Sequence, residues 1–377
     1  MAELPYPEIV SAAAGQLEFL RDRIRTYALA ESPSGDTASL AACAELIRTA
    51  HAELGGVVQT EDGGHLITTW DGEDQTPVLL LGHYDTVWPV GQLERMPYVD
   101  DGETIAGPGT YDMKAGIAIV EGAIRVLREL GLERRRRTVL LLTSDEEVGS
   151  TGSRPVVERL AAEASCVLGF EPPHPRGVLK TGRRGSTRIR LAVQGREAHA
   201  ALDRSDGVSA IDELLDQLQR VQDLLPTDGS VLPNIGTITG GTRANVIAGA
   251  AEAEIGLRFT RLDVEREVLG NLRGLTPVRD GADVTVQVLS NRPAWAAPTA
   301  NPLLDEVAEL GARLGQEVDG REAAGAGDSN FTGALGVPTL DGFGPIGKGA
   351  HALGESLSVG SLADRVALLA AYLARPS

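Results

Sequence analysis

Acidic and histidine side chains in this sequence follow directly after short apolar runs. Runs of this kind are typical of buried parallel strands, and open α/β sheets bind ligands at the carboxyl ends of such strands. Carboxylates gathered at one edge repel one another unless cations neutralise them. Asp112, in a Gly-rich turn before an apolar helix, and His351, near the C-terminus, are candidates of the same kind. There are three such runs, Val78–Leu81, Val139–Leu142 and Val167–Phe170. The residues that follow them are, in turn, His83 and Asp85, Glu146 and Glu147, and Glu171.

Each of these residues has an ordinary alternative role when it is taken singly. An aspartate before a helix is usually a cap, an adjacent acidic pair is usually a solvated loop, and a histidine at a strand end usually bonds to backbone. As a set they suit a pair of divalent metals, most plausibly zinc. In an extended segment His83 and Asp85 share a face, so that one can bind metal while the other holds the imidazole. Glu146 and Glu147 would point to opposite sides.

Composition indicates an enzyme of ordinary globular type. The 377 residues are 42% apolar and 23% charged, and a chain of this length favours two domains. The net charge of −18 argues against nucleic acid and anionic membranes as partners. We recognise no signal peptide, and two cysteines, Cys43 and Cys166, predict no disulfide framework and a cytoplasmic location. The basic run Arg134–Arg137 is interpreted as a solvated loop.

Helical and strand patterns alternate over the first 180 residues, which predicts a layered sheet covered by helices. A similar style returns from residue 301, with helices at 303–314 and 361–373 and a short strand at 338–340. The other predicted helices are 8–28, 37–54, 114–130 and 153–164, and the predicted strands are 57–60, 65–70, 78–82, 138–143 and 166–170.

Between these parts, residues alternate between apolar and polar, as in half-buried antiparallel strands. Their order, β-α-β-β-α-β, matches a split βαβ sandwich. We therefore predict a large α/β domain, 1–180 plus 291–377, with a small module, 181–290, inserted into it. The module's predicted strands are 187–194, 234–239, 251–259 and 284–289, and its predicted helices are 208–225 and 262–275.

Nine motifs, in order along the chain, resemble those of the di-zinc metallopeptidase and aminoacylase superfamily. They look most like its glutamate carboxypeptidase (glucarpidase-like) branch, and acetylornithine deacetylase and succinyl-diaminopimelate desuccinylase are similar relatives. The resemblance implies a large di-zinc aminopeptidase-like α/β catalytic domain whose inserted sandwich is a lid and dimerisation domain. GDSN departs from the superfamily pattern at Ser329 and Asn330. The motifs are GHYDTV, AGPGTYDMKAG, SDEEVGS, FEP, GREAHA, GGTRANVI, NRPAW, GDSNFTGALGVP and GAHA.

The resemblance also implies a role for each metal ligand. Asp112 would bridge two zinc ions, with His83 and Glu171 completing one site and Glu147 and His351 the other. Cobalt or manganese could replace zinc, because ligand type alone does not fix the metal. The peptide after Asp112 is often cis in this superfamily.

Further roles follow from the same resemblance. Asp85 would orient His83, and Glu146 would be the general base. His199 resembles a lid histidine that reaches the active site of a neighbouring subunit in a homodimer. An ordinary polar surface is the alternative for His199 and for the three residues that match substrate-binding positions. These three are Asn245, Arg258 and Arg292.

The leading hypothesis is a metal-dependent carboxypeptidase that releases a C-terminal amino acid, of glutamate type, from peptides or N-acyl amino acids. A water between two cations loses a proton near neutral pH and becomes the nucleophile. The alternative within the same chemistry is an N-acyl-amino-acid deacylase acting on acetylornithine or succinyl-diaminopimelate. A non-catalytic binding relative is a remote third hypothesis, because every expected ligand position is intact.

Overall fold

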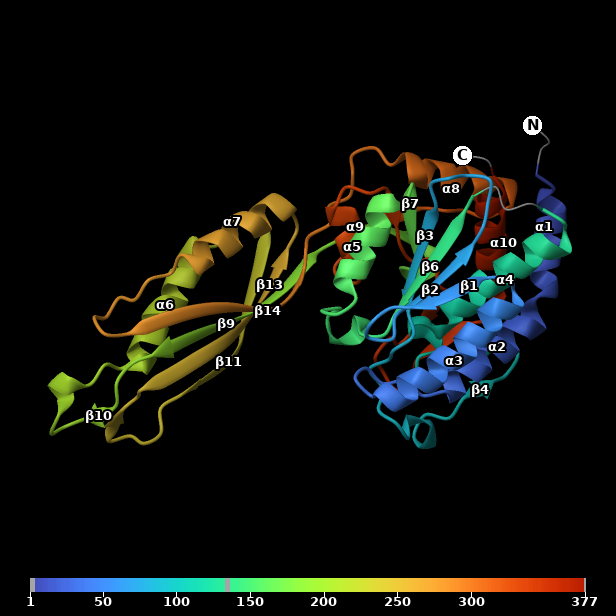
Figure 1. Cartoon of the computed structure of the whole chain (residues 1–377). Helices are drawn as coiled ribbons and strands as arrows, with labels where there is room; N and C mark the ends of the chain where they lie inside the picture. Colours follow the sequence, from blue (N-terminus) through green and yellow to red (C-terminus); the bar gives the residue numbers. More distant parts are fainter. Residues whose placement is uncertain (1–3, 133–135, 376–377) are drawn as a thin grey trace. The chain divides into compact units, whose positions relative to one another are not determined.

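The computed structural model describes residues 4–132 and 136–375 and divides into two compact units. The larger unit comprises Met1–Gly182, Ala297–Ala323 and Gly327–Ser377. The inserted unit comprises Arg183–Ala296 with Ala324–Ala326. Each unit combines helices with a sheet, so the α/β class predicted from the sequence is confirmed (Figure 1).

Six strands form the main sheet of the larger unit, in the order β1-β2-β6-β3-β7-β16. β3 pairs in parallel with β6 and β7, whereas β1 and β2 are antiparallel. The three apolar runs are therefore adjacent parallel strands, as predicted, and their carboxyl ends share one edge. The strands are β1 (Val57–Thr60), β2 (Leu66–Trp70), β3 (Val78–His83), β6 (Thr138–Thr143), β7 (Cys166–Gly169) and β16 (Thr339–Leu340).

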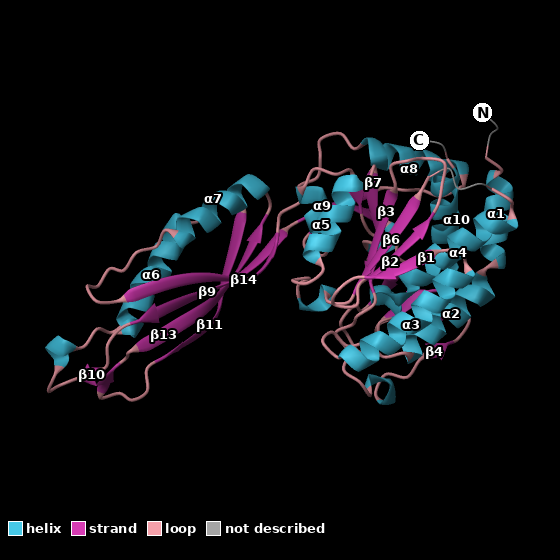
Figure 2. Ribbon diagram, viewed as in Figure 1, coloured by secondary structure: helices cyan, strands magenta, loops and turns pink. Residues whose placement is uncertain are grey.

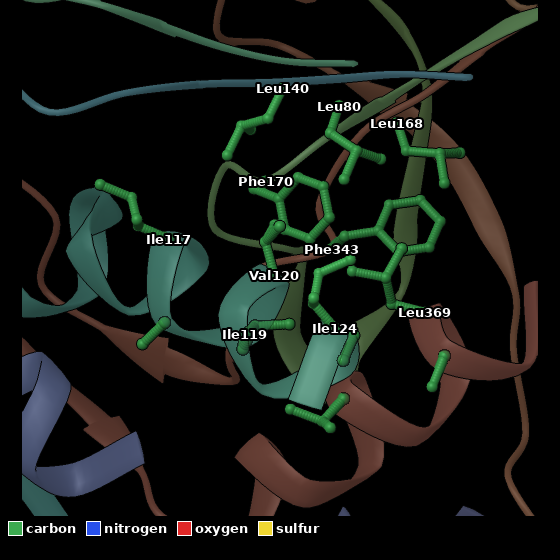
Figure 3. Packing of buried hydrophobic residues seen from close by; sticks show 14 of the residues in the cluster. Leu80, Ile117, Ile119, Val120, Ile124, Leu140, Leu168, Phe170, Phe343 and Leu369 are labelled. Carbon is green, nitrogen blue, oxygen red and sulfur yellow. The ribbon is translucent and has the colours of Figure 1, made fainter. Parts of the chain in front are cut away.

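Alternate side chains along these strands enter two apolar cores. Leu80 and Leu140 face helices α4 and α10, whereas Leu79 and Leu141 face α5 and α9, as the two-residue repeat of a strand requires. Figure 3 shows the first core, where Phe170 lies among these side chains. Because both faces are covered, polar side chains for chemistry must come from strand ends. The helices are α1 (Tyr6–Gly15), α2 (Leu17–Leu29), α3 (Thr37–Glu53), α4 (Ala115–Glu129), α5 (Arg154–Glu163), α8 (Pro302–Arg313), α9 (Ser329–Ala334) and α10 (Gly360–Ala374).

The inserted unit is a four-stranded antiparallel sheet, β11-β13-β9-β14, with α6 and α7 on one face (Figure 2). The chain order β9-α6-β11-β13-α7-β14 matches the predicted β-α-β-β-α-β sandwich. A small ribbon of β10 and β12 extends it. The elements are β9 (Gly185–Gln194), β10 (Ala198–His199), α6 (Ala210–Leu224), β11 (Val231–Gly240), β12 (Val246–Ile247), β13 (Ala250–Phe259), α7 (Leu262–Arg273) and β14 (Asp283–Arg292).

Several local expectations were wrong. The helix predicted at 8–28 breaks at Gln16, whose side chain bonds to Arg125 and Glu129 of α4. Arg136 is not solvated, because it is buried against Tyr372; residues 134 and 135 of that run lie outside the described residues. A second small sheet, β17-β18-β5-β4, was not predicted, because its strands are two or three residues long. With β8 (Leu179–Arg183) and its partner β15 (Gly320–Ala323), the remaining strands are β4 (Val99–Asp100), β5 (Thr104–Ala106), β17 (Gly347–Lys348) and β18 (Ser356–Ser358).

Two further features concern the helices and the cysteines. Over 4–132 and 136–375, no helix combines the length and the apolar character needed to cross a membrane. Cys43 and Cys166 are both buried free thiols.

Candidate metal centre

The carboxyl ends of β3, β6 and β7 bring the predicted metal ligands of the larger unit together. His83 is the last residue of β3, Glu171 follows β7, and Glu146 and Glu147 lie in a 3-10 turn after β6. The turn corrects the expectation that the two glutamates lie in an extended segment. Within each of three groups, the nearest side-chain ligand atoms lie within 4.8 Å of one another. The groups are His83, Asp112 and Glu171; His83, Glu146 and Glu147; and Asp112, Glu147 and His351.

Asp112 lies at the centre of this arrangement. Its Oδ1 is 3.3 Å from Nε2 of His83, and its Oδ2 is 3.4 Å from Nε2 of His351. The same two imidazole nitrogens lie 3.3 Å from Glu171 and 3.0 Å from Glu147, respectively. The two oxygens of Asp112 thus face two separate ligand groups, which is the arrangement that a bridging carboxylate needs.

Asp85 contacts the His83 ring through two of its groups, and the backbone carbonyl is the nearer one. Nδ1 of His83 is 2.9 Å from the backbone carbonyl of Asp85, whereas the Asp85 carboxylate is 3.4 Å away. A proton on Nδ1 that is donated to this carbonyl leaves the Nε2 lone pair for a metal. The Asp85 carboxylate instead accepts hydrogen bonds from the hydroxyl of Ser34 and from the N–H groups of Glu146 and Glu147. It therefore holds the turn that carries both glutamates.

The turn that carries Asp112 is packed closely against the end of β3. The Asp112–Met113 peptide is cis, as the resemblance implied. The Met113 side chain lies beside Gly82 and Gly116, where an added Cβ would come within 2.6 and 2.7 Å of its methyl group. Only glycine leaves this room, so the two glycines allow Met113 to be buried beneath Asp112.

Two residues that support the Asp112 turn were missed. The buried carboxylate of Glu355 accepts hydrogen bonds from backbone N–H groups of this turn. The buried ammonium of Lys114 donates to carbonyls at the end of α2. The signal for Glu355 was available in the sequence: it is an acid in a loop of small residues, four positions after His351.

In the centre without metal, burial and neighbouring charged groups shift the pKa values of the proposed ligands. Hydrogen bonds to Asp112 and Glu147 raise the pKa of His351 to about 10. Burial lowers the pKa of His83, but hydrogen bonds to Asp112 and neighbouring carboxylates outweigh it and leave the pKa well above its usual value. Burial also opposes ionisation of Asp112, yet hydrogen bonds from both imidazoles hold its pKa well below the usual range. Burial raises the pKa of Glu147. Without metal, protons on the imidazoles supply the positive charge.

These residues fit divalent metal ions. Glu147 Oε1 is buried and accepts no hydrogen bond from the described part of the chain. A buried acceptor without a donor is unfavourable unless something else fills that role. Imidazole nitrogens and carboxylate oxygens are the ligands that zinc accepts at catalytic sites.

The inserted unit brings its four predicted residues together in two pairs. Asn245 lies beside His199 at the β10–β12 ribbon, where the N–H of Ala200 bonds to the Asn245 carbonyl at 3.0 Å. Nδ1 of His199 accepts N–H bonds from Ala201 and Leu202, which leaves the ring proton on Nε2, free to be donated to a ligand.

The two arginines form the other pair. Arg258 on β13 and Arg292 on β14 both pair with Ser186 of β9, so they lie on the sheet face opposite the helices. The two pairs occupy opposite ends of the sheet. Eight residues of β13 separate Ala250 from Arg258, a span of roughly 25 Å.

Ser329 and Asn330 have a structural role in the described fold. Ser329 is 2% exposed and donates to the buried carboxylate of Asp341 at 2.7 Å. Asn330 is fully buried, and its Oδ1 accepts the N–H of Gly327. The departure of GDSN from the superfamily pattern therefore falls on side chains that hold the start of α9.

A mixed sheet with imidazoles and carboxylates at the ends of its parallel strands has the features of an α/β protein with a divalent-metal centre. The chain belongs to Peptidase family M20/M25/M40, whose model matches residues 79–375. It is therefore a metallohydrolase of peptide or acyl-amino-acid amide bonds, and the superfamily predicted from the sequence is confirmed.

Curated relatives cover most of the chain. Carboxypeptidase G2 of Pseudomonas sp. (strain RS-16) is 27% identical over 336 residues, which is 85% of this chain and 80% of the relative. A succinyl-diaminopimelate desuccinylase of Gluconacetobacter diazotrophicus is 33% identical over 328 residues, which is 81% of this chain and 82% of the relative.

Solved structures share the fold. A tripeptidase from Staphylococcus aureus superposes with a TM-score of 0.74 at 20% identity and covers 95% of this chain and 99% of its own. The M20 family metallo-carboxypeptidase Sso-CP2 from Sulfolobus solfataricus superposes with a TM-score of 0.71 at 13% identity. The match covers 94% of this chain and 98% of the Sso-CP2 chain.

Proposed function

We propose that this enzyme is a carboxypeptidase that releases a C-terminal amino acid, of glutamate type, from peptides or N-acyl amino acids. The observation that carries amide hydrolysis is the position of Asp112 between His83 and His351, with Glu146 in an adjoining ligand group. Arg258 and Arg292 support the proposal that the substrate carries a terminal carboxylate, because guanidinium groups bind carboxylates with matched geometry.

The proposed ligands divide into two sets that share Asp112. His83 and Glu171 would hold one divalent ion, most plausibly zinc, and Glu147 and His351 the other. When bound, the ions supply a water of lowered pKa and polarise the substrate carbonyl. Cobalt and manganese are compatible with the same ligands.

Glu146 is the proposed general base. It is 8% exposed, its backbone N–H donates to Asp85 at 3.2 Å, and one of its carboxylate oxygens lies within 4.8 Å of ligand atoms of His83 and Glu147. It takes the proton of the attacking water and passes it to the leaving amine nitrogen. His199 and Asn245 stabilise the negative charge that develops on the carbonyl oxygen.

Substitution of Glu146 by alanine tests this assignment. Loss of general-base catalysis should lower kcat on acyl-glutamate substrates by about 10²–10⁴-fold, while two metal ions per chain remain bound. Normal turnover by the metal-loaded variant would contradict the role.

A second function is favoured by the 33% identity to a succinyl-diaminopimelate desuccinylase. An N-acyl-amino-acid deacylase would use the same metal ligands and base, with a different acyl group. A panel of acyl-glutamates, dipeptides, acetylornithine and succinyl-diaminopimelate separates the two. Higher kcat/KM on either of the last two would replace the carboxypeptidase proposal. Metal binding without turnover on the panel would favour a binding protein.

The proposed assembly is a homodimer formed through the inserted unit. β11 is an edge strand whose outer N–H and C=O groups are unpaired within this sheet, a surface that invites strand pairing. Ile238 on β11 and Leu215 on α6 are 55% and 56% exposed. Pairing with the same edge of a second copy would cover these apolar side chains.

Dimerisation would also explain why the inserted unit carries two separated pairs. His199 and Asn245 lie roughly 25 Å or more along the sheet from Arg258 and Arg292, too far for both pairs to touch one small substrate. In the proposed dimer, one substrate meets the arginines of its own chain and the His199 and Asn245 of the other chain. The inserted unit thus acts as a lid on the partner's site.

A further inference from the structure

Glu355 is a fully buried carboxylate that has no part in the proposed reaction. Its Oε1 accepts the N–H groups of Tyr111 at 2.9 Å and Asp112 at 3.0 Å. Its Oε2 accepts the N–H of Gly109 at 3.0 Å and the indole N–H of Trp88 at 2.7 Å. Because each oxygen accepts two N–H donors, the group acts purely as an acceptor for this turn.

Glu355 belongs to the same short loop as His351, between β17 and β18. His351 Nε2 lies 3.4 Å from Oδ2 of Asp112, while Glu355 holds the backbone N–H of Asp112. The segment 351–355 therefore contacts Asp112 at both its carboxylate and its backbone. Because the His351 side chain is 53% exposed, packing restrains it little, and its distance from Asp112 depends on how the loop is anchored.

The other ligand group shares Asp112, but its two remaining ligands are anchored independently of this loop. His83 ends the central strand β3 and is held by the backbone carbonyl of Asp85. Glu171 follows the neighbouring strand β7.

We propose that Glu355 is a positioning residue that fixes His351 relative to Asp112 and thereby sets the affinity of the metal position formed by Asp112, Glu147 and His351. This inference rests on the proposed two-metal function. It predicts that the two metal positions respond unequally to loss of Glu355. The position of His83, Asp112 and Glu171 takes two of its three ligands from the ends of β3 and β7 and should be the less affected.

The test is metal retention in Glu355→Gln, which keeps the shape of the side chain but turns an amide NH₂ toward N–H donors. Zinc-loaded protein is equilibrated with graded free-zinc buffers, and bound zinc per chain is measured by mass spectrometry under native conditions. We expect one of the two ions to be lost at a free zinc concentration about 10–100-fold higher than in the wild type. The other ion should shift much less.

Three variants make the test specific. Glu121→Gln alters another fully buried glutamate of the larger unit, bonded to Tyr27 and Arg23, and should lower the Tm without changing either zinc affinity. Trp88→Phe removes one donor but keeps the carboxylate and should stay close to wild type. Glu355→Asp keeps the charge but has a shorter side chain, and it should show the same unequal loss of zinc. It replaces Glu355→Gln in the test if the glutamine variant does not fold.

Four outcomes overturn the inference. If Glu355→Gln keeps both ions at wild-type affinity, or loses both in equal proportion while the wild type binds two, Glu355 does not position His351. If Glu121→Gln shows the same unequal loss, the effect reflects stability alone. A wild type that binds no pair of ions would instead overturn the two-metal function, and this inference with it.

Discussion

At the scale of single residues, the charge state of the metal-free centre is set by neighbours. His351 faces Asp112 and Glu147, and these hydrogen bonds raise its pKa to about 10. A protonated His351 cannot offer Nε2 to a metal ion. Proton and metal therefore compete for the same lone pair.

Metal uptake by the metal-free protein should release this proton. At about pH 7.5, below the raised pKa, nearly every His351 is protonated, so zinc binding should release protons and tighten as the pH rises toward 10. Calorimetric titrations in buffers of different ionisation enthalpy measure the release, and His351→Ala should release fewer protons. Heats that do not depend on the buffer would contradict this prediction.

The same raised pKa contributes to the pH dependence of the metal-free fold. Because the folded pKa of His351 lies above its ordinary value of 6.5, its pairing with carboxylates stabilises the fold fully below about pH 6.5 and is lost as the pH rises through about 10. The side chain is half exposed, so solvent weakens this contribution.

At the scale of elements, the end of β3 and the start of α4 must meet closely enough to hold Asp112. Gly82 of β3 and Gly116 of α4 both lie against the methyl group of Met113. A side chain at either position would push Met113 toward the other element, and the Asp112 turn would move with it.

Gly82→Ala should therefore cost stability and metal affinity together. Its Cβ would lie 2.6 Å from the Met113 methyl group, and overpacking of this kind costs about 1–3 kcal/mol. Urea unfolding of the metal-free protein and zinc titration measure the two effects. Gly15→Ala is the matched control, because a Cβ at Gly15 meets no atom within 4 Å. Equal stability of Gly82→Ala and wild type would show that the packing relaxes freely.

The strand ends could be predicted because a run of apolar residues indicates a buried strand. Polar residues directly after such a run must lie at the edge of the sheet. That rule placed His83, Glu171 and the Glu146–Glu147 pair at the edge, whereas the choice of Glu147 as the ligand came from the family resemblance. Ser34 and Glu355 could not be placed in this way, since each lies in a loop and bonds to a group far along the chain: Ser34 to the Asp85 carboxylate, and Glu355 to the backbone N–H of Asp112. Which group of Asp85 faces His83 could not be predicted for a related reason: the chain turns after β3, so the carbonyl of Asp85 comes closer to Nδ1 than its carboxylate does.

At the scale of the whole molecule, the proposed dimer makes each active site depend on two chains. The inserted unit carries His199 at one end of its sheet and Arg292 at the other. A site completed in this way needs residues from both copies. Two inactive variants that lack different residues of the site could therefore restore one complete site in a mixed dimer.

Mixing His199→Ala with Glu146→Ala should restore activity. In a mixed dimer, one site combines the intact Glu146 of one chain with the intact His199 of the other, so equal mixing should give about a quarter of wild-type activity. Each variant alone and an exchange assay with tagged chains are the controls. A mixture that exchanges subunits but stays inactive would place His199 in its own chain's site or outside the reaction.

Because the two native thiols are buried, a label can be attached selectively to a cysteine introduced in the inserted unit. Cys43 is fully buried, Cys166 is 4% exposed, and burial raises the pKa of the Cys166 thiol, so both should react slowly with thiol-directed probes. Leu202, beside His199, is 79% exposed. A cysteine introduced there would accept a single fluorophore or spin label without prior removal of the native cysteines, so that distances between labels could report directly on the geometry of the working assembly.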